Sequence, residues 1–394
     1  MPVLPRIFTP LTSAALLAAG CVAAILSACG GGGMGSSGMG MASATSTTGM
    51  SCMSMDMPMT CPPPTITMVS PGAVVHRTVT LTADVGMSGG NMMVMMVDFM
   101  VDGTTVGMST KAPYTVSWDT TTTNDGSHTL TAQVSDNMDH MVNSRPVSVQ
   151  VNNNPTFTVA MTPGQLIPAP ASSASATAAL GAKLANGTFS GKVTISGVTA
   201  TAVTVNQGFA GSAGSMVIAL TANEGTAGEW DVPAGAMLTD DQMTALMQGA
   251  LYVVAASPAN PAGELRGQIT PANVMVTFSA LQGNQEVPPV TTAATGIAAT
   301  TVDTSADTLT VHLHTSGIAD AMAANVNNGG MGAAGSMLAP LSKDDVDPGH
   351  WSTQLATIGA ADVANFKAGK WYVNVATSVD PNGLIRGQIQ LPGN

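Results

Sequence analysis

The chain has 394 residues, of which 45% are hydrophobic but only 9% are charged, and its formal net charge is −12. A chain of this length accommodates about two to three domains of ordinary size. Nucleic-acid binding depends on clustered Lys and Arg, so 11 such residues against 23 Asp and Glu exclude a nucleic-acid binder of the usual kind. The same balance disfavours docking on anionic lipid through a basic patch.

Residues 1–28 are predicted to be a secretory signal peptide. Arg6 supplies a positive charge, and an apolar run begins near Leu11 and continues to Ala28. This run is almost long enough to span a bilayer, so a retained membrane anchor is an alternative.

The end of the apolar run, Leu26-Ser27-Ala28-Cys29, resembles the lipobox of bacterial lipoproteins. The resemblance implies cleavage before Cys29 and lipid attachment to its thiol, so that the membrane itself becomes a partner. Gly30 stands where an Asp would retain the protein at the inner membrane. In a Gram-negative host we therefore expect the outer membrane, on its periplasmic or surface face. An ordinary signal peptide with a chance cysteine is the alternative.

Residues 29–61 are predicted to be a disordered, flexible tether, because they are rich in Gly, Ser and Met and show no periodic apolar face. Cys52 and Cys61 are its only free thiols, and outside the cytoplasm we expect them to form a disulfide. A dithiol metal site is the alternative. Five methionines lie between these two cysteines or just before them: Met50, Met53, Met55, Met57 and Met59.

Residues 62–153 are predicted to be a β-sandwich. Six segments alternate apolar and polar residues, at 65–69, 79–83, 95–103, 114–118, 128–134 and 146–151. Turns are predicted at Asp102-Gly103 and Asp125-Gly126.

Three short motifs of this module are similar to those of the bacterial Ig-like family. They are Val97-Asp98-Phe99, Ala112-Pro113-Tyr114 and Ser117-Trp118-Asp119. The resemblance implies an Ig-like domain in which Tyr114 and Trp118 are core or corner residues.

The remaining chain contains two copies of one unit. Gly249-Ala-Leu-Tyr252 recurs as Gly369-Lys-Trp-Tyr372, and Arg266-Gly-Gln-Ile recurs as Arg386-Gly-Gln-Ile. A period of about 120 residues is too long for a solenoid, so we predict two tandem β-rich domains at 155–271 and 276–392. A short helix is predicted after an N-cap at Thr239, with a counterpart at 359–366.

The two units resemble CHRD domains, which are found in chordin and in many exported bacterial proteins. Gln285-Glu286-Val287-Pro288-Pro289 and the closing Arg-Gly-Gln-Ile of both copies carry the resemblance. It implies an extracytoplasmic β-rich module, but it does not imply a particular biochemical role. Relatives often carry histidines where this chain has other residues, namely Thr204, Asn206, Ala256, Asn325, Asn327 and Ala376. Any role of that histidine cluster is therefore expected to be lost.

No catalytic residue is predicted, because motifs for nucleophilic or phosphoryl chemistry are missing from the sequence. His312 and His314 lie two residues apart on a predicted strand and therefore share a face, as metal ligands can. Without a third ligand, a solvated strand face is the preferred interpretation. Arg266 and Arg386 are expected to pair with a carboxylate such as Glu229 or Glu264.

Methionine is the unusual feature, because 16 of the 28 methionines lie between Met34 and Met108. Period two places Met93 and Met95 on the core face of their strand, and Met92, Met96 and Met100 on the other face. A further possible site in the following loop consists of Met138, His140 and Met141. Thioethers select Cu(I), so copper is a candidate ligand of these residues and of the tether methionines. Compositional drift is the alternative.

The sequence thus predicts an all-β chain in which an Ig-like sandwich and two tandem CHRD domains follow a disordered tether. We expect a non-enzymatic, lipid-anchored binding or structural protein of the bacterial cell envelope, with envelope proteins or glycans as partners and no cofactor. The alternative is a copper-binding or copper-tolerance protein that uses its Met-rich region.

Overall fold

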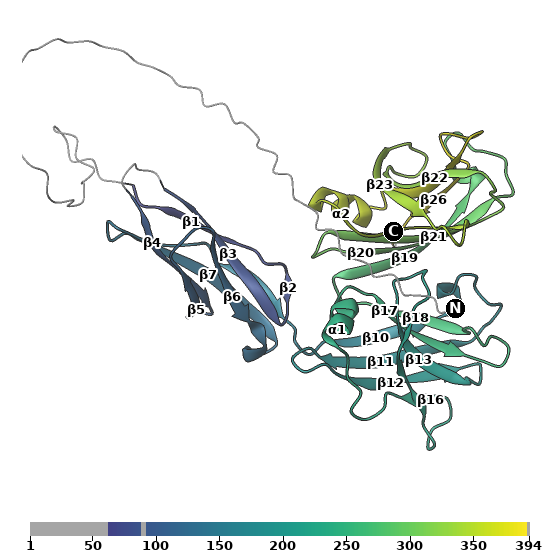
Figure 1. Ribbon diagram of the computed structural model, residues 1–394, viewed down its shortest axis with the longest axis horizontal. Helices are drawn as coiled ribbons and strands as arrows, with labels where there is room; N and C mark the ends of the chain where they lie inside the picture. The colour runs from purple at the N-terminus through teal and green to yellow at the C-terminus, as the bar shows by residue number, and fades with distance from the viewer. Residues whose placement is uncertain (1–61, 88–91, 392–394) are drawn as a thin grey trace, which may run out of the picture. The chain divides into compact units, whose positions relative to one another are not determined.

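A computed structural model describes residues 62–87 and 92–391, which form three successive β domains (Figure 1). The all-β prediction is confirmed. The predicted signal peptide and tether, with Cys29, Cys52, Cys61 and the methionines at 50, 53, 55, 57 and 59, lie outside the described residues.

The N-terminal module is a sandwich of two sheets. The first contains, in spatial order, β1 (Thr65–Val69), β3 (Thr78–Gly86) and β6 (Tyr114–Asp119). The second contains β2 (Val74–Val75), β9 (Val147–Val151), β7 (Gly126–Asp136), β4 (Val94–Val101) and β5 (Thr104–Ser109), with β8 (Met141–Asn143) also paired to β7. Leu81, Phe99 and Trp118 are buried between the sheets, so Trp118 is a core residue as expected.

All six predicted strands of this module are present, and the Asp102-Gly103 turn connects β4 to β5. Both turn residues have positive φ, 49° and 80°, as a two-residue hairpin turn of type I′ requires. His128 of β7 fixes this turn, because its Nδ1 lies 2.6 Å from Asp102 Oδ2. The strands β2, β5 and β8 were not predicted, since they are short or carry little apolar alternation.

The start of β4 does not follow the predicted alternation. Val97 and Phe99 are fully buried as expected, but Met92 is only 8% exposed, whereas Met93 and Met95 are 63% and 54% exposed. The assignment of faces to these three methionines was therefore wrong. The cause is a bulge between Val94 and Met96 in the pairing with β7. One extra residue in a strand moves every preceding side chain to the opposite face.

The first repeat contains two sheets. One has the order β10 (Thr156–Met161), β11 (Ser175–Lys183), β12 (Thr188–Ser196), β16 (Glu229–Asp231) and β15 (Thr221–Ala222). The other has the order β14 (Met216–Ala219), β13 (Ala202–Gln207), β17 (Leu251–Ala256) and β18 (Leu265–Ile269). Phe189, Leu246 and Leu251 are among the fully buried residues of its core.

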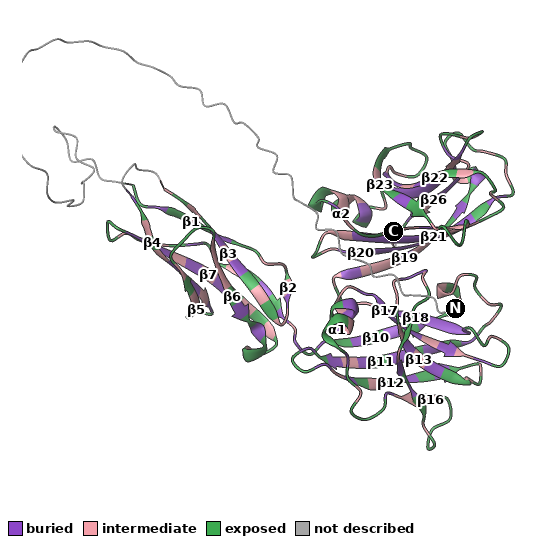
Figure 2. Ribbon diagram, in the orientation of Figure 1, coloured by how far each residue is buried: buried purple, intermediate pink, exposed green. Residues whose placement is uncertain are grey.

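The second repeat is a closed barrel with the same strand order. Around the barrel lie β19 (Val274–Gln282), β20 (Thr295–Asp303), β21 (Thr308–Ser316), β24 (His350–Thr357), β23 (Ser336–Lys343), β22 (Ala321–Asn328), β25 (Trp371–Thr377) and β26 (Ile385–Ile389). The strand that corresponds to β23 is divided into β14 and β15 in the first repeat. Figure 2 shows buried residues alternating with exposed ones along the strands of both repeats.

Each repeat contains one helix, α1 (Asp240–Met247) or α2 (Ala360–Lys367), where the sequence predicted it. Thr239 caps α1 through a reciprocal pair of hydrogen bonds, in which its Oγ1 accepts from Gln242 N and its own N donates to Gln242 Oε1. Three 3₁₀ turns are also present in the described chain: η1 (Thr120–Thr122), η2 (Pro163–Gln165) and η3 (Gly283–Gln285). No helix within 62–87 or 92–391 is long and apolar enough to cross a membrane.

The capping box of α1 generates a prediction about stability. Replacing Thr239 by Ala removes the acceptor for the Gln242 amide, so Thr239→Ala is expected to lower the unfolding free energy of the first repeat by about 1 kcal/mol. Urea denaturation of the full chain measures the change. Thr239→Ser keeps the hydroxyl and should leave stability nearly unchanged, so equal losses in both variants would argue against the capping role.

Candidate functional site

The closing motif of the second repeat forms a buried polar clamp around Arg386, which is only 2% exposed. Its guanidinium donates to the carbonyl oxygens of Gly330 and Ala333, both at 2.9 Å, and to Gln388 Oε1 at 3.0 Å. The same group stacks on the Tyr372 ring, 3.5 Å from the ring centroid. Arginine thus holds the Gly-rich loop that follows β22 against the sheet.

Gln388 completes this clamp with further bonds to the backbone. Its side-chain amide donates to the carbonyl oxygens of Gly329 and Gly369, at 3.0 and 2.9 Å. Its backbone N–H donates to Gln285 Oε1 at 3.1 Å. At the other end of the loop, Gly335 N donates to the Tyr372 hydroxyl at 3.1 Å. All of these partners belong to the same domain.

The first repeat contains the same clamp, bond for bond. Arg266 donates to the carbonyl oxygens of Phe209 and Ser212 and to Gln268 Oε1, and lies 3.6 Å from the Tyr252 centroid. Burial lowers the pKa of Arg266 to about 10, which the charge of Tyr252 opposes. The expected pairing of Arg266 and Arg386 with Glu229 or Glu264 is therefore wrong. Glu229 binds Lys192, while Glu264 accepts from Ser257 and Asn260.

The two copies differ at the residue that follows Gln285 in the second repeat and its counterpart Gln165 in the first. The second repeat has Glu286, which is 6% exposed, whereas the first repeat has Leu166. Glu286 lines a cavity of about 490 Å³ together with Val287, Met331 and Arg386. Burial raises the pKa of this carboxyl to about 7, against the opposing charge of Arg386. Its Oε1 has no hydrogen-bond partner and could accept a bond from a ligand in this cavity.

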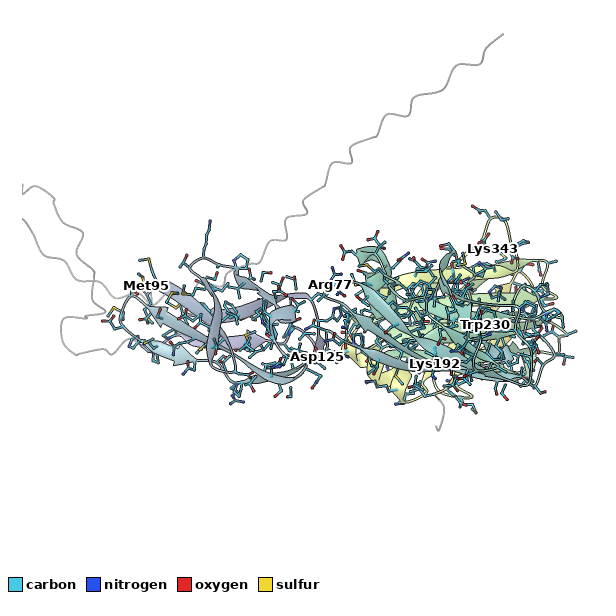
Figure 3. The ribbon with its side chains drawn as sticks, turned by 90° about the horizontal axis from the view of Figure 1, so that it is seen from below. Arg77, Met95, Asp125, Lys192, Trp230 and Lys343 are labelled. Atoms are coloured by element: carbon cyan, nitrogen blue, oxygen red, sulfur yellow. The ribbon has the colours of Figure 1, made fainter. Side chains whose placement is uncertain are left out.

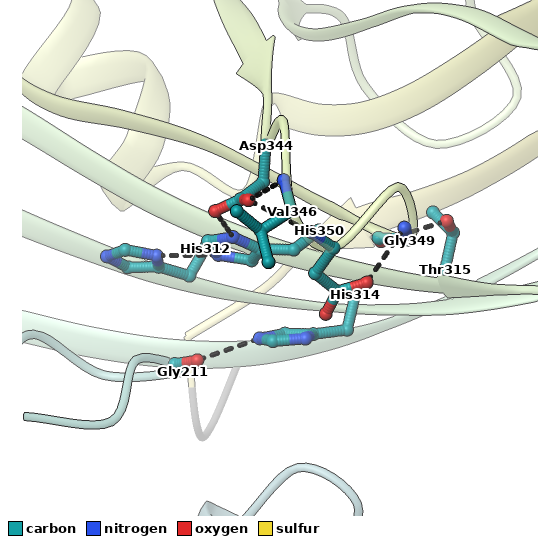
Figure 4. Close-up of polar contacts among 9 residues, drawn as sticks. Gly211, His312, His314, Thr315, Asp344, Val346, Gly349 and His350 are labelled. Atoms are coloured by element: carbon teal, nitrogen blue, oxygen red, sulfur yellow. Dashed lines mark hydrogen bonds and ion pairs between the residues drawn. The ribbon is translucent and has the colours of Figure 1, made fainter.

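His312 and His314 meet a third imidazole, that of His350 on β24 (Figure 4). His350 lies directly opposite His314 in the strand pairing, and its Nε2 is 3.0 Å from His312 Nδ1. His350 Nδ1 lies 3.3 Å from Asp344 Oδ2. A carboxylate only accepts hydrogen bonds, so His350 Nδ1–H donates to Asp344 Oδ2. His350 Nε2 then carries the lone pair and accepts from His312 Nδ1–H. His312 Nε2 is then an acceptor, and it is buried without a partner.

This cluster is a hydrogen-bonded chain of two imidazoles and a carboxylate. No group of three or more His, Cys, Asp or Glu side chains is arranged to hold a metal ion within the described ranges. The preferred interpretation of a solvated strand face is also wrong, because His312 is only 3% exposed. The first repeat covers this face: a Cβ added to Gly211 would lie 2.9 Å from His312 Cβ, and His314 Nε2 is 2.8 Å from the Gly211 carbonyl oxygen.

The corresponding position in the first repeat carries an ion pair. Thr194 is paired with Glu229 there, as His314 is paired with His350 in the second repeat. Lys192 therefore corresponds to His312, and its Nζ lies 2.8 Å from Glu229 Oε2. The duplicated fold tolerates either a charged pair or an imidazole pair at this site.

Asn206 and Asn327, at two of the positions where relatives are expected to carry histidine, form neutral contacts in this chain. Asn327 Nδ2 donates to Asn374 Oδ1 at 2.8 Å, and Asn206 Nδ2 lies 3.4 Å from the Tyr252 hydroxyl. Neither Asn nor the Ala residues at 256 and 376 can act as an imidazole ligand or proton shuttle.

The predicted metal ligands of the N-terminal module are divided by the fold. Met96 and Met100 lie partly exposed on the outer face of β4, while Met92 is buried. Met138 and Met141 are 40% and 66% exposed at the turn between β7 and β8, and His140 lies between them. Metal binding by these residues and by the tether methionines stays a prediction.

Comparisons with known proteins agree with this architecture. The family model described as "CHRD domain" matches residues 157–269 and 277–389, and the one described as "Bacterial Ig domain" matches residues 64–132. No curated protein matches the chain.

Three solved structures show partial similarity. Fibronectin(III)-like modules of Clostridium thermocellum CbhA are 26% identical over 22% of this chain and 93% of that chain, with a TM-score of 0.18. A tetra-tandem repeat in the extending region of a large adhesion protein is 14% identical over 83% of this chain and 99% of that chain, with a TM-score of 0.19. The N-terminal eight Ig domains of Down Syndrome Cell Adhesion Molecule are 8% identical over 79% of this chain and 46% of that chain, with a TM-score of 0.19. TM-scores this low carry no argument about function.

The clamped loop generates a prediction about two of its glycines. A Cβ at Gly335 would collide with the carbonyl group of Asn328, whereas a Cβ at Gly330 would meet nothing within 4 Å. We expect Gly335→Ala to destabilise the second repeat by about 3 kcal/mol, as overpacking does, and Gly330→Ala to change stability little. Thermal unfolding of the full chain compares the two. Similar melting temperatures for both variants would contradict a tightly held loop.

The histidine cluster generates a prediction about pH. Burial lowers the pKa of His312 to about 4, and the charges of His350, His314 and Arg266 act in the same direction. The unfolded chain therefore binds a proton near pH 6.5, where the folded chain does not. Stability should be greatest above pH 6.5 and fall by about 3 kcal/mol towards pH 4, at about 1.4 kcal/mol per pKa unit.

Denaturation curves of the wild type and of His312→Gln, measured between pH 4 and 7.5, test this dependence. The variant should show a flatter profile across that window. Parallel profiles would mean that His312 does not control the acid sensitivity.

Proposed function

The chain belongs to the CHRD domain family, and we propose that it is a lipid-anchored binding or structural protein of the bacterial cell envelope without catalytic activity. CHRD and bacterial Ig-like domains are the domains of structural or binding extracellular proteins. The proposal extends this to a particular place, the outer membrane, and to a particular mode of attachment, the lipid on Cys29.

The observation that carries the proposal is the duplicated clamp. The Arg, Tyr and Gln side chains of the repeated motif all bond to backbone groups or to one another within their own domain. Residues held in this way stabilise a scaffold, and a catalytic group instead needs an accessible partner for a reacting atom. The repeats therefore present rigid β surfaces, on which we expect envelope proteins or glycans to bind.

The anchor is supported by the sequence order of apolar run, Leu26-Ser27-Ala28-Cys29 and tether. Acyl chains contribute about 0.8 kcal/mol of membrane affinity for each buried methylene, so two or more chains hold a protein firmly to a bilayer. A long tether then allows the folded domains to work at a distance from that surface.

Labelling with radioactive palmitate in a Gram-negative host tests the anchor. We expect the wild-type chain to incorporate label, to enter the detergent phase on Triton X-114 extraction and to sediment with the outer membrane. Cys29→Ser should abolish labelling and leave the signal peptide attached. Cys21→Ser is the matched control, because Cys21 lies within the same apolar run, and it should behave as wild type. Labelling that survives Cys29→Ser would refute the assignment.

A further inference from the structure

The cavity of the second repeat contains a buried carboxyl group whose bonding is incomplete. Glu286 is 6% exposed, and its Oε1 accepts no hydrogen bond. Gly383 allows the carboxyl group to lie against the backbone, because a Cβ at that position would be 2.6 Å from Glu286 Cδ. Burying a carboxylate without enough donors costs free energy, so buried polar groups are normally paired. A ligand in the cavity would supply the missing donor.

The first repeat shows how the same fold satisfies a buried glutamate. Glu264 is 4% exposed, and its Oε2 accepts from Ser257 Oγ at 2.7 Å and from Asn260 Nδ2 at 2.5 Å. Side-chain hydrogen bonds, with that of Asn260 as the largest cause, lower the pKa of Glu264, whereas burial raises the pKa of Glu286. The two buried glutamates thus have opposite environments, and the one that lacks donors lines a cavity of about 490 Å³.

The charges around Glu286 favour a cation as its partner. Burial raises the pKa of its carboxyl group, the charge of Arg386 opposes this rise, and the charge of Asp380 adds to it. Two acidic groups therefore face a single guanidinium, which already donates to the carbonyl oxygens of the clamped loop. Glu229 of the first repeat, in contrast, is paired with the exposed Lys192, which is labelled in Figure 3. A comparable cation for Glu286 would come from a ligand.

Apolar side chains line the cavity beside this carboxyl group. They are Val287, Pro289 and Met331, of which Val287 and Met331 are 42% and 74% exposed. Side chains this exposed contribute little to the core, and a ligand that covers them removes apolar surface from water. The volume of the cavity lies within the range of about 300–1,000 Å³ that is typical of small-molecule sites, where a few polar groups orient a largely apolar ligand.

We propose that this cavity binds a small aliphatic amine, whose ammonium group pairs with the Glu286 carboxylate while its alkyl chain covers Val287 and Met331. An ammonium group carries three donors and no acceptor, which suits a carboxylate that lacks donors. An anionic ligand is disfavoured, because Arg386 is only 2% exposed and is already bonded. The first repeat is not expected to bind the amine, because Leu166 stands in the place of Glu286. The site is independent of the lipid anchor.

Isothermal titration calorimetry of the full chain with n-hexylamine tests the proposal. The amine should bind at least tenfold more tightly than 1-hexanol, which has the same alkyl chain without the charge. Glu286→Gln and Glu286→Leu should each weaken binding of the amine at least tenfold. The leucine variant is expected to fold, because Leu166 occupies the same position in the first repeat. Glu224→Gln, which removes an exposed negative charge elsewhere, is the matched control and should bind as wild type does.

Two results of this titration would overturn the proposal. Equal affinity for the amine in wild type and in both Glu286 variants would remove the carboxylate from the site. Equal affinity of the wild type for hexylamine and hexanol would mean that the cavity recognises only the alkyl chain.

The pH dependence of binding tests the ion pair separately. Because the pKa of Glu286 is raised to about 7, its carboxyl group is mostly protonated at pH 6 and mostly ionised at pH 8. An alkylammonium group, like that of lysine, remains protonated over this range. Affinity should therefore rise about tenfold from pH 6 to pH 8 in the wild type and change little in Glu286→Gln. Parallel profiles for the two chains would contradict an ion pair with Glu286.

NMR of the methionine methyl groups shows where the ligand binds. Hexylamine should shift the methyl signal of Met331, which lines the cavity. Met322 and Met337 are 69% and 61% exposed in the same repeat, and their signals should not move. Equal shifts of all three signals, or no shift of the Met331 signal, would place the amine outside this cavity and refute the site.

A second probe distinguishes a free amine from a lysine side chain of another protein. Nα-acetyl-lysine amide presents the same ammonium group and alkyl chain on a peptide backbone. We expect it to bind more weakly than hexylamine, because its backbone adds polar groups that an apolar rim does not satisfy. Tighter binding of the lysine derivative would assign the site to a protein partner and overturn the ligand as stated.

Discussion

The interaction on which both repeats depend is the burial of one arginine against backbone carbonyl groups. An arginine remains protonated in a protein, so a guanidinium that is nearly inaccessible to water needs acceptors for its N–H groups to offset its lost hydration. The terminal nitrogens of Arg266 and Arg386 obtain them from a loop that contains few side chains of its own, while Nε of Arg266 is buried without a partner. The same bonds that stabilise the charge therefore determine the path of the loop, and the tyrosine ring beneath the guanidinium excludes water from the other side.

The clamp explains why the two copies could diverge elsewhere without losing their fold. Lys192 and Glu229 in one repeat correspond to His312 and His350 in the other, and Leu166 corresponds to Glu286. None of these pairs contributes a hydrogen bond to the clamp. Differences between the copies thus lie outside the shared scaffold, on a strand face and in a cavity. Any binding specificity that distinguishes the repeats belongs to such positions.

The sequence predicts those features whose signal is local. Period-two alternation located the longer strands, Asp102-Gly103 located a hairpin, and Thr239 located a helix start, because each requires only neighbouring residues. The partners of Arg266 and Arg386 could not be predicted, since every residue carries a backbone carbonyl oxygen and the sequence does not indicate which ones lie near the arginine. His350 lies 38 residues beyond His312, and only the pairing of β21 with β24 brings them together. The burial of His312 depends on a neighbouring domain, so the residue pattern of its own strand cannot predict it.

The bulge at the start of β4 could not be predicted from the sequence either. A bulge is a property of two paired strands, so the alternation of residues in one strand does not reveal it. It is also what turns Met93 and Met95 outward and places Met92 in the core. In a regular strand, Met93 and Met95 would pack inside the sandwich. The bulge, which the alternation of β4 alone does not predict, is therefore the feature that exposes these two thioethers to solvent.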